Sequence, residues 1–186
     1  MGRECEGLSH GMACDMRHGV QSAIPGKDAF VYRYGGIYEH SPWVAETVWD
    51  SGQALDDPIA LADVMQVVVE GAGHMRQVTL LRAHPDLAGR LGLADLTVDS
   101  CSEQQGAGLD CCSESELTEF QHLNETYKDR FGFPFILAVK GHNRTSILDN
   151  FRKRVDNDQN TEFREALDQV HRIARFRLQA LAEENR

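Results

Sequence analysis

The chain has 186 residues, which suits a single domain with a sizeable hydrophobic core. Hydrophobic residues make up 41% of it and charged residues 26%, as in ordinary soluble globular proteins. The formal net charge of −10 argues against a general nucleic-acid binder, and no apolar run is long enough for a membrane span.

The cysteines do not follow the pattern of a zinc site or of a small disulfide-bonded scaffold. Their number is odd, two are adjacent and no CxxC pair occurs: Cys5, Cys14, Cys101, Cys111 and Cys112. Reduced thiols in a reducing compartment are therefore predicted. Because the N-terminus also lacks the apolar stretch of a secretory signal, the predicted location is the cytoplasm.

The first part of the chain is predicted to lie outside the folded domain. Residues 1–26 are rich in Gly, Cys and Met and have no periodic apolar pattern, so a poorly ordered leader is expected there. The predicted domain is 27–186, with its folded part beginning near Phe30.

Helices dominate the first half of this domain. One is expected to begin at Ser41–Pro42, because proline is favoured at the first position of a helix. A longer one is expected from Asp57–Pro58 to about Met75, with two glycines weakening its last turn. A short segment over 78–83 then stops at His84, because the following proline disfavours helical backbone.

The second half reads in the same way. Ser113 and Glu116 form a capping box for a helix with the buried stripe Leu117, Phe120, Asn124, Tyr127 and Phe131. A non-helical apolar run follows over 131–139, then a helix capped by Asn143 to about Val155 and a last helix from about Thr161 to Ala182. Strand patterns are nearly absent. The predicted fold is an all-α, single-domain helical bundle of about seven to nine helices.

His84 is the first candidate for chemistry. It stands before Pro85 at a predicted helix junction, on backbone of restricted conformation, where a histidine can act as a general acid or base near neutral pH. A plain surface histidine at a helix end is the alternative, and it is favoured when His84 is taken alone.

Ser100 and Glu103 follow with the spacing S-x-x-E. The Glu103 carboxylate could orient His84 or hold a substrate N–H. The spacing equally matches a capping box, which is favoured about two to one on spacing alone. The two interpretations are compatible, because a helix N-terminus also presents amides to an anion.

Arg177 is placed unusually on the last predicted helix. It lies three residues after Ala174 and four before Leu181, on the stripe expected to be buried. An arginine there needs an acidic partner, a ligand carboxylate or a route to solvent. A ligand role and a side chain extending to solvent near the chain end are about equally favoured.

The run over 131–139 is either plain core or a wall of a binding site. Pro134, Gly132 and Gly141 break regular structure, so its backbone N–H and C=O groups need partners. A flat, amide-rich heterocycle could supply some of them. The eight histidines show no HxH or HExxH spacing and no nucleotide-binding glycine motif occurs, so neither a metal nor an organic cofactor is predicted.

Four stretches of the sequence resemble the OHCU decarboxylase family, where OHCU is 2-oxo-4-hydroxy-4-carboxy-5-ureidoimidazoline, an intermediate between urate and allantoin. They are RAHPDLAGR, TVDSCSEQQGAGL, LNETYKDRFGFPFILAVKG and TEFREALDQVHRIARFRL. The resemblance spans roughly 28–182. It implies an all-α, cofactor-free enzyme, usually a homodimer, that decarboxylates OHCU to (S)-allantoin.

The resemblance also implies the site. His84 would be the catalytic acid/base, with Glu103 close to it and Arg177 near the substrate. The implied substrate-binding residues are Pro85, Ser100, Cys101, Ser102, Glu103, Gln104, Phe135, Ile136, Leu137, Ala138 and Val139.

Two other functions stay open at this point. A hydrolase of a related ureido-imidazole would need an activated water, usually on a metal, and no ligand cluster is found in the sequence. In a non-catalytic helical binding module, Ser100 and Glu103 would only cap a helix and His84→Ala would change nothing. The decarboxylase accounts for more of the sequence than either.

Overall fold

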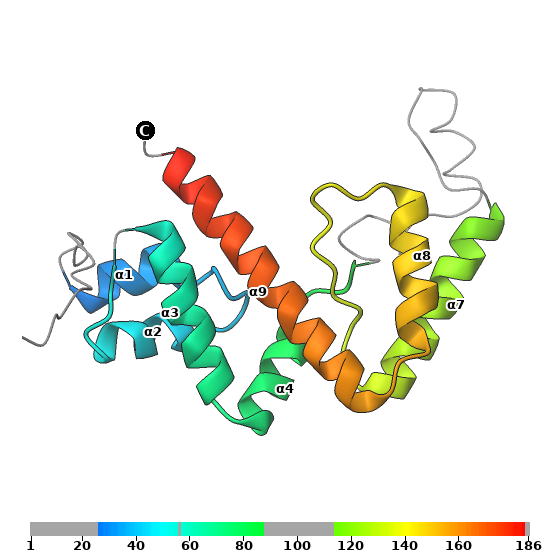
Figure 1. Cartoon of the computed structure of the whole chain (residues 1–186), viewed down its shortest axis with the longest axis horizontal. Helices are drawn as coiled ribbons and strands as arrows, with labels where there is room; N and C mark the ends of the chain where they lie inside the picture. The colour runs from blue at the N-terminus through cyan, green and yellow to red at the C-terminus, as the bar shows by residue number, and fades with distance from the viewer. Residues whose placement is uncertain (1–25, 56, 88–113, 185–186) are drawn as a thin grey trace, which may run out of the picture.

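The computed structural model describes residues 26–55, 57–87 and 114–184, and these form seven helices (Figure 1). The helices are α1 (Lys27–Tyr34), α2 (Trp43–Asp50), α3 (Pro58–Gly71), α4 (His74–Ala83), α7 (Glu114–Phe131), α8 (Arg144–Val155) and α9 (Gln159–Glu183). The prediction of an all-α fold is confirmed. None of the described helices is both long and apolar enough to cross a membrane.

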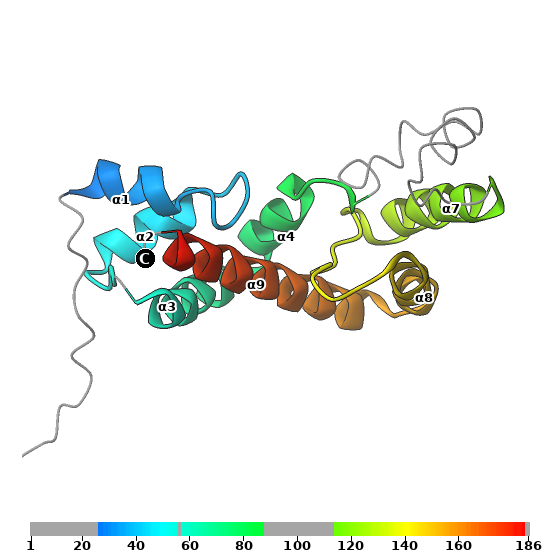
Figure 2. The ribbon, with the colours of Figure 1, turned by 90° about the horizontal axis from the view of Figure 1, so that it is seen from above.

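The 25-residue helix α9 organises the molecule. It runs diagonally across Figure 1, and α1, α2 and α3 gather at its C-terminal end while α7 and α8 lie at its start. The shorter α4 lies between the two groups in both ribbon views (Figure 2). Helix α9 packs on α3, α4 and α7, so one helix carries residues into every part of the core.

Local capping signals in the sequence set several helix starts. Asp57 accepts hydrogen bonds from the backbone N–H groups of Ile59 and Ala60, each at 3.3 Å, with Pro58 at the first helical position. Asn143 and Ser146 form a reciprocal capping box at the start of α8. Both predicted starts are confirmed.

Three boundaries differ from the predictions. The helix expected to reach Met75 ends at Gly71, because Gly73 takes a φ of 80° that a helix cannot continue through, and α4 starts at His74. The last helix starts at Gln159 because Asp158 caps it, accepting from the N–H groups of Asn160 and Thr161. Helix α1 was not predicted; its buried residues are Phe30 and Tyr34, and the partly buried Val31 also packs against the core.

A single aromatic-rich core joins the two ends of the fold. On α7 the predicted stripe is buried at Phe120, Asn124, Tyr127 and Phe131. The ring of Tyr127 lies edge-on to that of Phe135, with centroids 5.2 Å apart, and Phe135 stacks on Phe151 of α8 at 3.7 Å. The apolar run after α7 is therefore inserted into the core between α7, α8 and α9.

Candidate active site

His84 lies where α4 ends. Its backbone is extended, with φ −69° and ψ 135°, and its N–H donates to the carbonyl of Leu81 at 3.2 Å. The predicted junction before Pro85 is confirmed. Only 5% of the His84 surface is exposed, which excludes the plain surface histidine that was the alternative interpretation.

The segment from Phe135 to Val139 has no regular structure, as predicted, and four of its five residues are buried. The glycines on either side have φ values of 74° at Gly132 and 87° at Gly141, which turn the chain into and out of the core. The segment starts beside α4, because Arg82 Nε donates to the Gly132 carbonyl at 3.0 Å. A cavity of about 260 Å³ lies at this junction, lined by Arg82, Lys128, Gly132, Phe133 and Pro134.

Protein side chains supply part of the hydrogen bonding of this segment. Arg154 Nη1 donates to the Ile136 carbonyl at 2.7 Å, and the Ala138 N–H donates to Gln169 Oε1 at 2.9 Å. The N–H groups of Leu137 and Val139 have no hydrogen bond within the described part of the chain. These two amides are donors that a ligand could use.

Arg154 belongs to a buried charged cluster that the sequence analysis did not predict. Its guanidinium contacts Glu162 Oε1 through Nε at 3.0 Å and Nη2 at 2.5 Å, and lies 4.5 Å from the centroid of the Phe135 ring. The Tyr127 hydroxyl donates to the same oxygen, and Asn157 Nδ2 donates to Glu162 Oε2 at 2.7 Å. Burial raises the pKa of Tyr127, which therefore stays a neutral donor.

A signal for this cluster was present in the sequence. Arg154 lies three residues after Phe151 and seven after Ile147, on the buried side of α8. Glu162 lies four residues before Ala166, on the buried side of α9. The positional argument used for Arg177 would have singled out both residues.

Arg177 has an acidic partner, one of the three solutions that its position allowed. Nη2 pairs with Glu39, and Nη1 donates to the carbonyls of Gly36 at 3.3 Å and Ile37 at 3.1 Å. These three residues form part of the loop between α1 and α2. The neighbouring Phe176 ring lies 5.1 Å from Lys140 Nζ, so this turn of α9 also borders the end of the 135–139 segment.

The same loop is fixed to α9 by a second contact. The Tyr38 hydroxyl lies 2.7 Å from His171 Nδ1, and His171 Nε2 lies 3.0 Å from Glu70. A carboxylate only accepts hydrogen bonds, so we assign the proton to Nε2 and let Tyr38 donate to Nδ1. Burial lowers the pKa of His171, and burial raises that of Tyr38, so both groups are neutral near pH 7.

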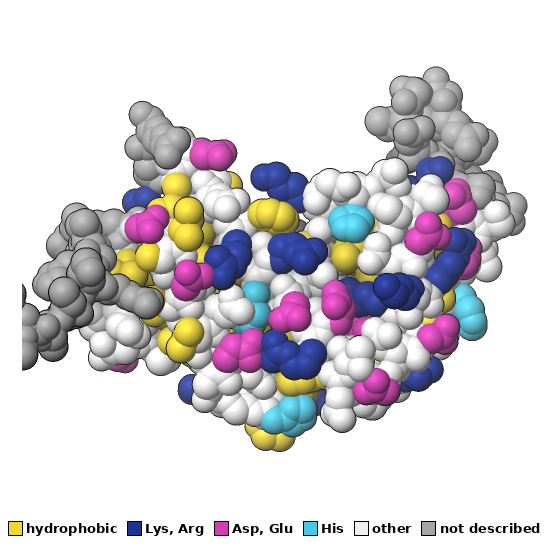
Figure 3. All heavy atoms as spheres, viewed as in Figure 1, with side chains coloured by type: hydrophobic (Ala, Val, Ile, Leu, Met, Phe, Trp, Pro, Cys, Tyr) yellow, Lys and Arg dark blue, Asp and Glu magenta, His cyan; other side chains and the backbone are white. Residues whose placement is uncertain are grey.

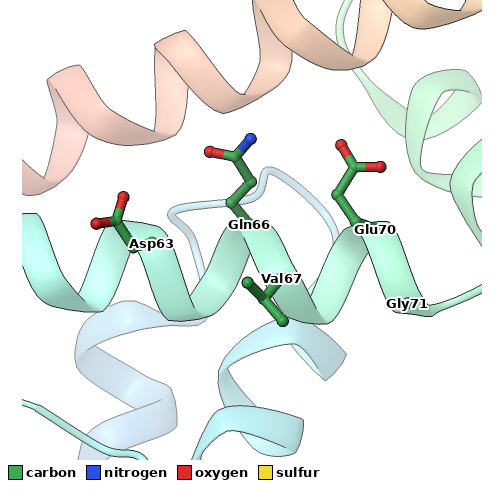
Figure 4. Close-up of a pocket in the computed structure, with 5 residues that line it drawn as sticks. All are labelled: Asp63, Gln66, Val67, Glu70 and Gly71. Atoms are coloured by element: carbon green, nitrogen blue, oxygen red, sulfur yellow. The ribbon is translucent and has the colours of Figure 1, made fainter.

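A larger hollow of about 610 Å³ lies along α3 and contains none of the predicted site residues. Asp63, Gln66 and Glu70 point toward α9, and Val67 points away (Figure 4). Arg175 donates to Asp63 and Gln66, Arg164 donates to Glu70, and His171 also contacts Glu70. The space-filling view shows acidic and basic side chains interleaved across the middle of this face (Figure 3). These polar contacts stabilise the packing of α3 on α9, and we assign no catalytic residue among them.

The remaining predicted residues cannot be placed. Ser100, Cys101, Ser102, Glu103 and Gln104 lie outside the described residues, as does Ser113. The choice between a ligand contact and a helix cap for Ser100 and Glu103 thus stays a prediction. Among the residues that the structure does describe, no three His, Cys, Asp or Glu side chains gather in a way that could hold a metal ion.

The chain is similar to known proteins over most of its length. The OHCU decarboxylase family model matches residues 25–179. A 2-oxo-4-hydroxy-4-carboxy-5-ureidoimidazoline decarboxylase of Haloferax volcanii is 48% identical over 151 residues, which is 81% of this chain and 88% of that protein.

Two solved structures share the fold. The crystal structure of an (S)-allantoin synthase superposes with a TM-score of 0.67 at 34% identity, covering 84% of this chain and half, 50%, of that one. An OHCU decarboxylase crystallised in the presence of (S)-allantoin gives a TM-score of 0.57 over 84% of this chain and 98% of that one, and at 18% identity it shows the fold alone. The chain belongs to the OHCU decarboxylase family.

Proposed function

We propose that this chain decarboxylates OHCU to (S)-allantoin in urate degradation, without a cofactor and with His84 as the acid/base. Membership of the family, with several relatives that carry the name OHCU decarboxylase, supports the reaction. One structural observation carries the choice of residue: His84 is buried, on restrained backbone, at the end of a helix. A buried histidine in that position is suited to proton transfer near neutral pH.

The substrate supplies its own electron sink. OHCU carries a carboxylate and a hydroxyl on one carbon, beside a C=N bond. When the bond to the carboxylate breaks, CO₂ leaves and the electron pair passes into the ring. Protonation of one face then gives a single enantiomer. We assign to His84 either the hydroxyl proton or this stereodefining proton, which contributes roughly 10²–10⁴-fold, while positioning supplies the rest.

The other predicted residues take supporting roles in this proposal. Glu103 fixes the His84 tautomer or holds a ureido N–H, and Arg177 orients an anionic or carbonyl oxygen of the substrate. Pro85 and residues 100–104 line the ring. Residues 135–139 offer backbone groups, and the N–H groups of Leu137 and Val139, which have no hydrogen bond among the described residues, support that assignment.

We also propose that the chain is a cytoplasmic homodimer whose catalytic domain is 27–186. Exposed large apolar side chains, among them Tyr32, Ile59, Val67 and Met75, provide surface that a second copy could cover. The family match begins at residue 25, close to the proposed domain boundary. Sedimentation equilibrium tests the oligomeric state, and a monomer at micromolar concentration would exclude the dimer.

The experiment that tests the function uses OHCU made freshly from urate. We would follow the loss of its ultraviolet absorbance together with the circular dichroism of the allantoin formed. The expected result is decay far above the spontaneous rate, giving (S)-allantoin, abolished in His84→Ala and retained in His122→Ala, which removes an exposed histidine of α7. Decay at the spontaneous rate with racemic product would favour the binding module. Activity lost on chelation would favour the metal-dependent hydrolase.

A further inference from the structure

The turn that carries His84 is attached to helix α7. Asp86 lies two residues after His84, and its Oδ2 accepts a hydrogen bond from Asn124 Nδ2 at 3.1 Å. Lys128 Nζ forms an ion pair with the same carboxylate oxygen. Asn124 and Lys128 are four residues apart, so they lie one turn apart on the same face of α7. A single face of one helix thus binds the residue that follows the His84–Pro85 junction.

Asn124 is a polar residue in a buried position, where one of its polar atoms is left unpaired within the described part of the chain. Only 8% of its surface is exposed, and its Oδ1 is a buried acceptor with no hydrogen-bond partner among the residues that the structure describes. Buried polar groups are almost always paired, and the exceptions tend to mark positions with a functional constraint. An apolar side chain of similar size would avoid the unpaired carbonyl. Among the described residues, the hydrogen bond to Asp86 is the one that the Asn124 side chain makes, and we infer that this contact accounts for a polar residue here.

The chain on the N-terminal side of His84 is also attached, to the residue that follows α7. Two residues before His84, Arg82 donates to the carbonyl of Gly132, the residue that follows α7. In the views of Figures 1 and 2 the end of α4 runs toward the segment that leaves α7. Pro85 restricts the backbone between the two attachments. The imidazole is therefore carried by a short segment held at both ends by α7 and its continuation.

We propose that Asp86 is a positioning residue for His84: through Asn124 and Lys128, α7 sets the place of the imidazole relative to the bound substrate. This inference rests on the proposed function. Asp86 acts through the backbone of its own turn and does not touch the substrate. Because a misplacement of about 1 Å can cost 10²-fold in rate, loosening this attachment lowers kcat while substrate binding, made mainly by other segments, is retained.

Asn124→Leu is the sharper test. It removes the hydrogen bond to Asp86 and also the unpaired carbonyl, without changing any charge. We expect kcat for OHCU to fall at least tenfold with KM within twofold of wild type, and the melting temperature to be unchanged or raised. A merely structural residue would lower the melting temperature and leave kcat of the folded protein unchanged, and that result would overturn the proposal.

Asp86 variants give a graded second test. Asp86→Ala removes the contacts with Asn124 and Lys128, and we expect kcat to fall about 10²-fold; Asp86→Asn keeps an acceptor for Asn124 and should recover part of that loss. Asp129→Asn, which changes an exposed carboxylate of α7, is the matched control and should keep wild-type kcat. Wild-type protein that does not turn over OHCU would refute the proposed function itself. Active wild type with unaltered kcat in Asn124→Leu and Asp86→Ala would refute only the positioning role.

Discussion

Replacing Glu162 by Gln tests how the 135–139 segment is held. The Glu162 side chain is completely buried, and its carboxylate accepts from Arg154, Tyr127 and Asn157. Glutamine has nearly the same shape but exchanges one oxygen for an NH₂ group, which faces a donor whichever way the amide is turned. Arg154, a residue that is only 4% exposed, is left without the counter-charge of its guanidinium.

The expected loss of stability is large. Breaking a buried ion pair by removing one partner costs about 3–5 kcal/mol, because the remaining charge stays desolvated. Domains of this kind have about 5–15 kcal/mol of unfolding free energy in total, so the change is a large fraction of it. With a urea m-value of about 2 kcal/mol/M, the midpoint of unfolding should fall by roughly 1.5–2.5 M.

Urea denaturation followed by far-ultraviolet circular dichroism measures this shift. Glu119→Gln is the matched control, because Glu119 also accepts from Nε and Nη2 of an arginine, Arg152, at 2.7 Å for both atom pairs, but on the surface and with one nitrogen on each oxygen. Water screens that pair, so we expect a much smaller change there. If Glu162→Gln and Glu119→Gln shift the midpoint equally, the assumption that the Arg154–Glu162 pair is desolvated is wrong.

A double variant separates stability from function. Arg154→Met with Glu162→Leu replaces the pair by apolar side chains and should recover much of the stability lost in Glu162→Gln. It leaves the Ile136 carbonyl without the Arg154 donor, 2.7 Å away in the native protein. We therefore expect a stable protein with a raised KM for OHCU. A double variant with normal KM would show that Arg154 does not position the 135–139 segment.

Two further predictions concern α9. Gln169→Leu leaves the buried Ala138 N–H without its acceptor and should lower the unfolding free energy by about 1–3 kcal/mol, measured by urea denaturation; no loss would mean that water replaces the amide. The folded-state pKa of His171 is lowered by burial, so below its ordinary value of 6.5 the unfolded chain binds more protons. Stability should therefore fall as pH is lowered from about 7 toward 5, and His171→Gln should flatten that slope. Glu70, whose pKa is lowered chiefly by its hydrogen bond with Arg164, loses its contribution only below its ordinary 4.5, so an unchanged slope in His171→Gln would exclude His171 as the source.

The sequence predicted best those features that are determined within a few residues. Asp57 and Asn143 cap helices through donors two or three positions away, and Pro85 restricts the residue immediately before it. The break between α3 and α4 was missed for the opposite reason. Apolar spacing continues across it, and only the left-handed conformation of Gly73 in the folded chain ends the first helix. The conformation of Gly73 depends on how α3 and α4 pack on α9, which the local sequence does not specify.

The ion-pair partners of buried arginines are likewise predictable from sequence only when they lie close along the chain. A buried arginine on an apolar stripe is visible in the sequence, yet its partner can be near or far. Arg154 finds Glu162 eight residues away, whereas Arg177 finds Glu39 at a separation of 138. The turn between α8 and α9 brings Arg154 and Glu162 together, whereas the overall packing of the bundle brings Arg177 and Glu39 together. No spacing rule covers the second case, so only its need for a partner could be predicted.

The 135–139 segment shows what the structure adds to a correct family assignment. The sequence predicted that its backbone needs partners and that a heterocycle could supply some of them. Arg154 donates to the Ile136 carbonyl and Gln169 accepts from the Ala138 N–H, so side chains of α8 and α9 hold the backbone of these two segment residues. Donors that a substrate could use remain at Leu137 and Val139. Under the proposed function, we expect changes to Arg154 or Gln169 to alter KM by displacing this segment. The two backbone amides would stay available to the substrate, because side-chain substitution cannot remove them.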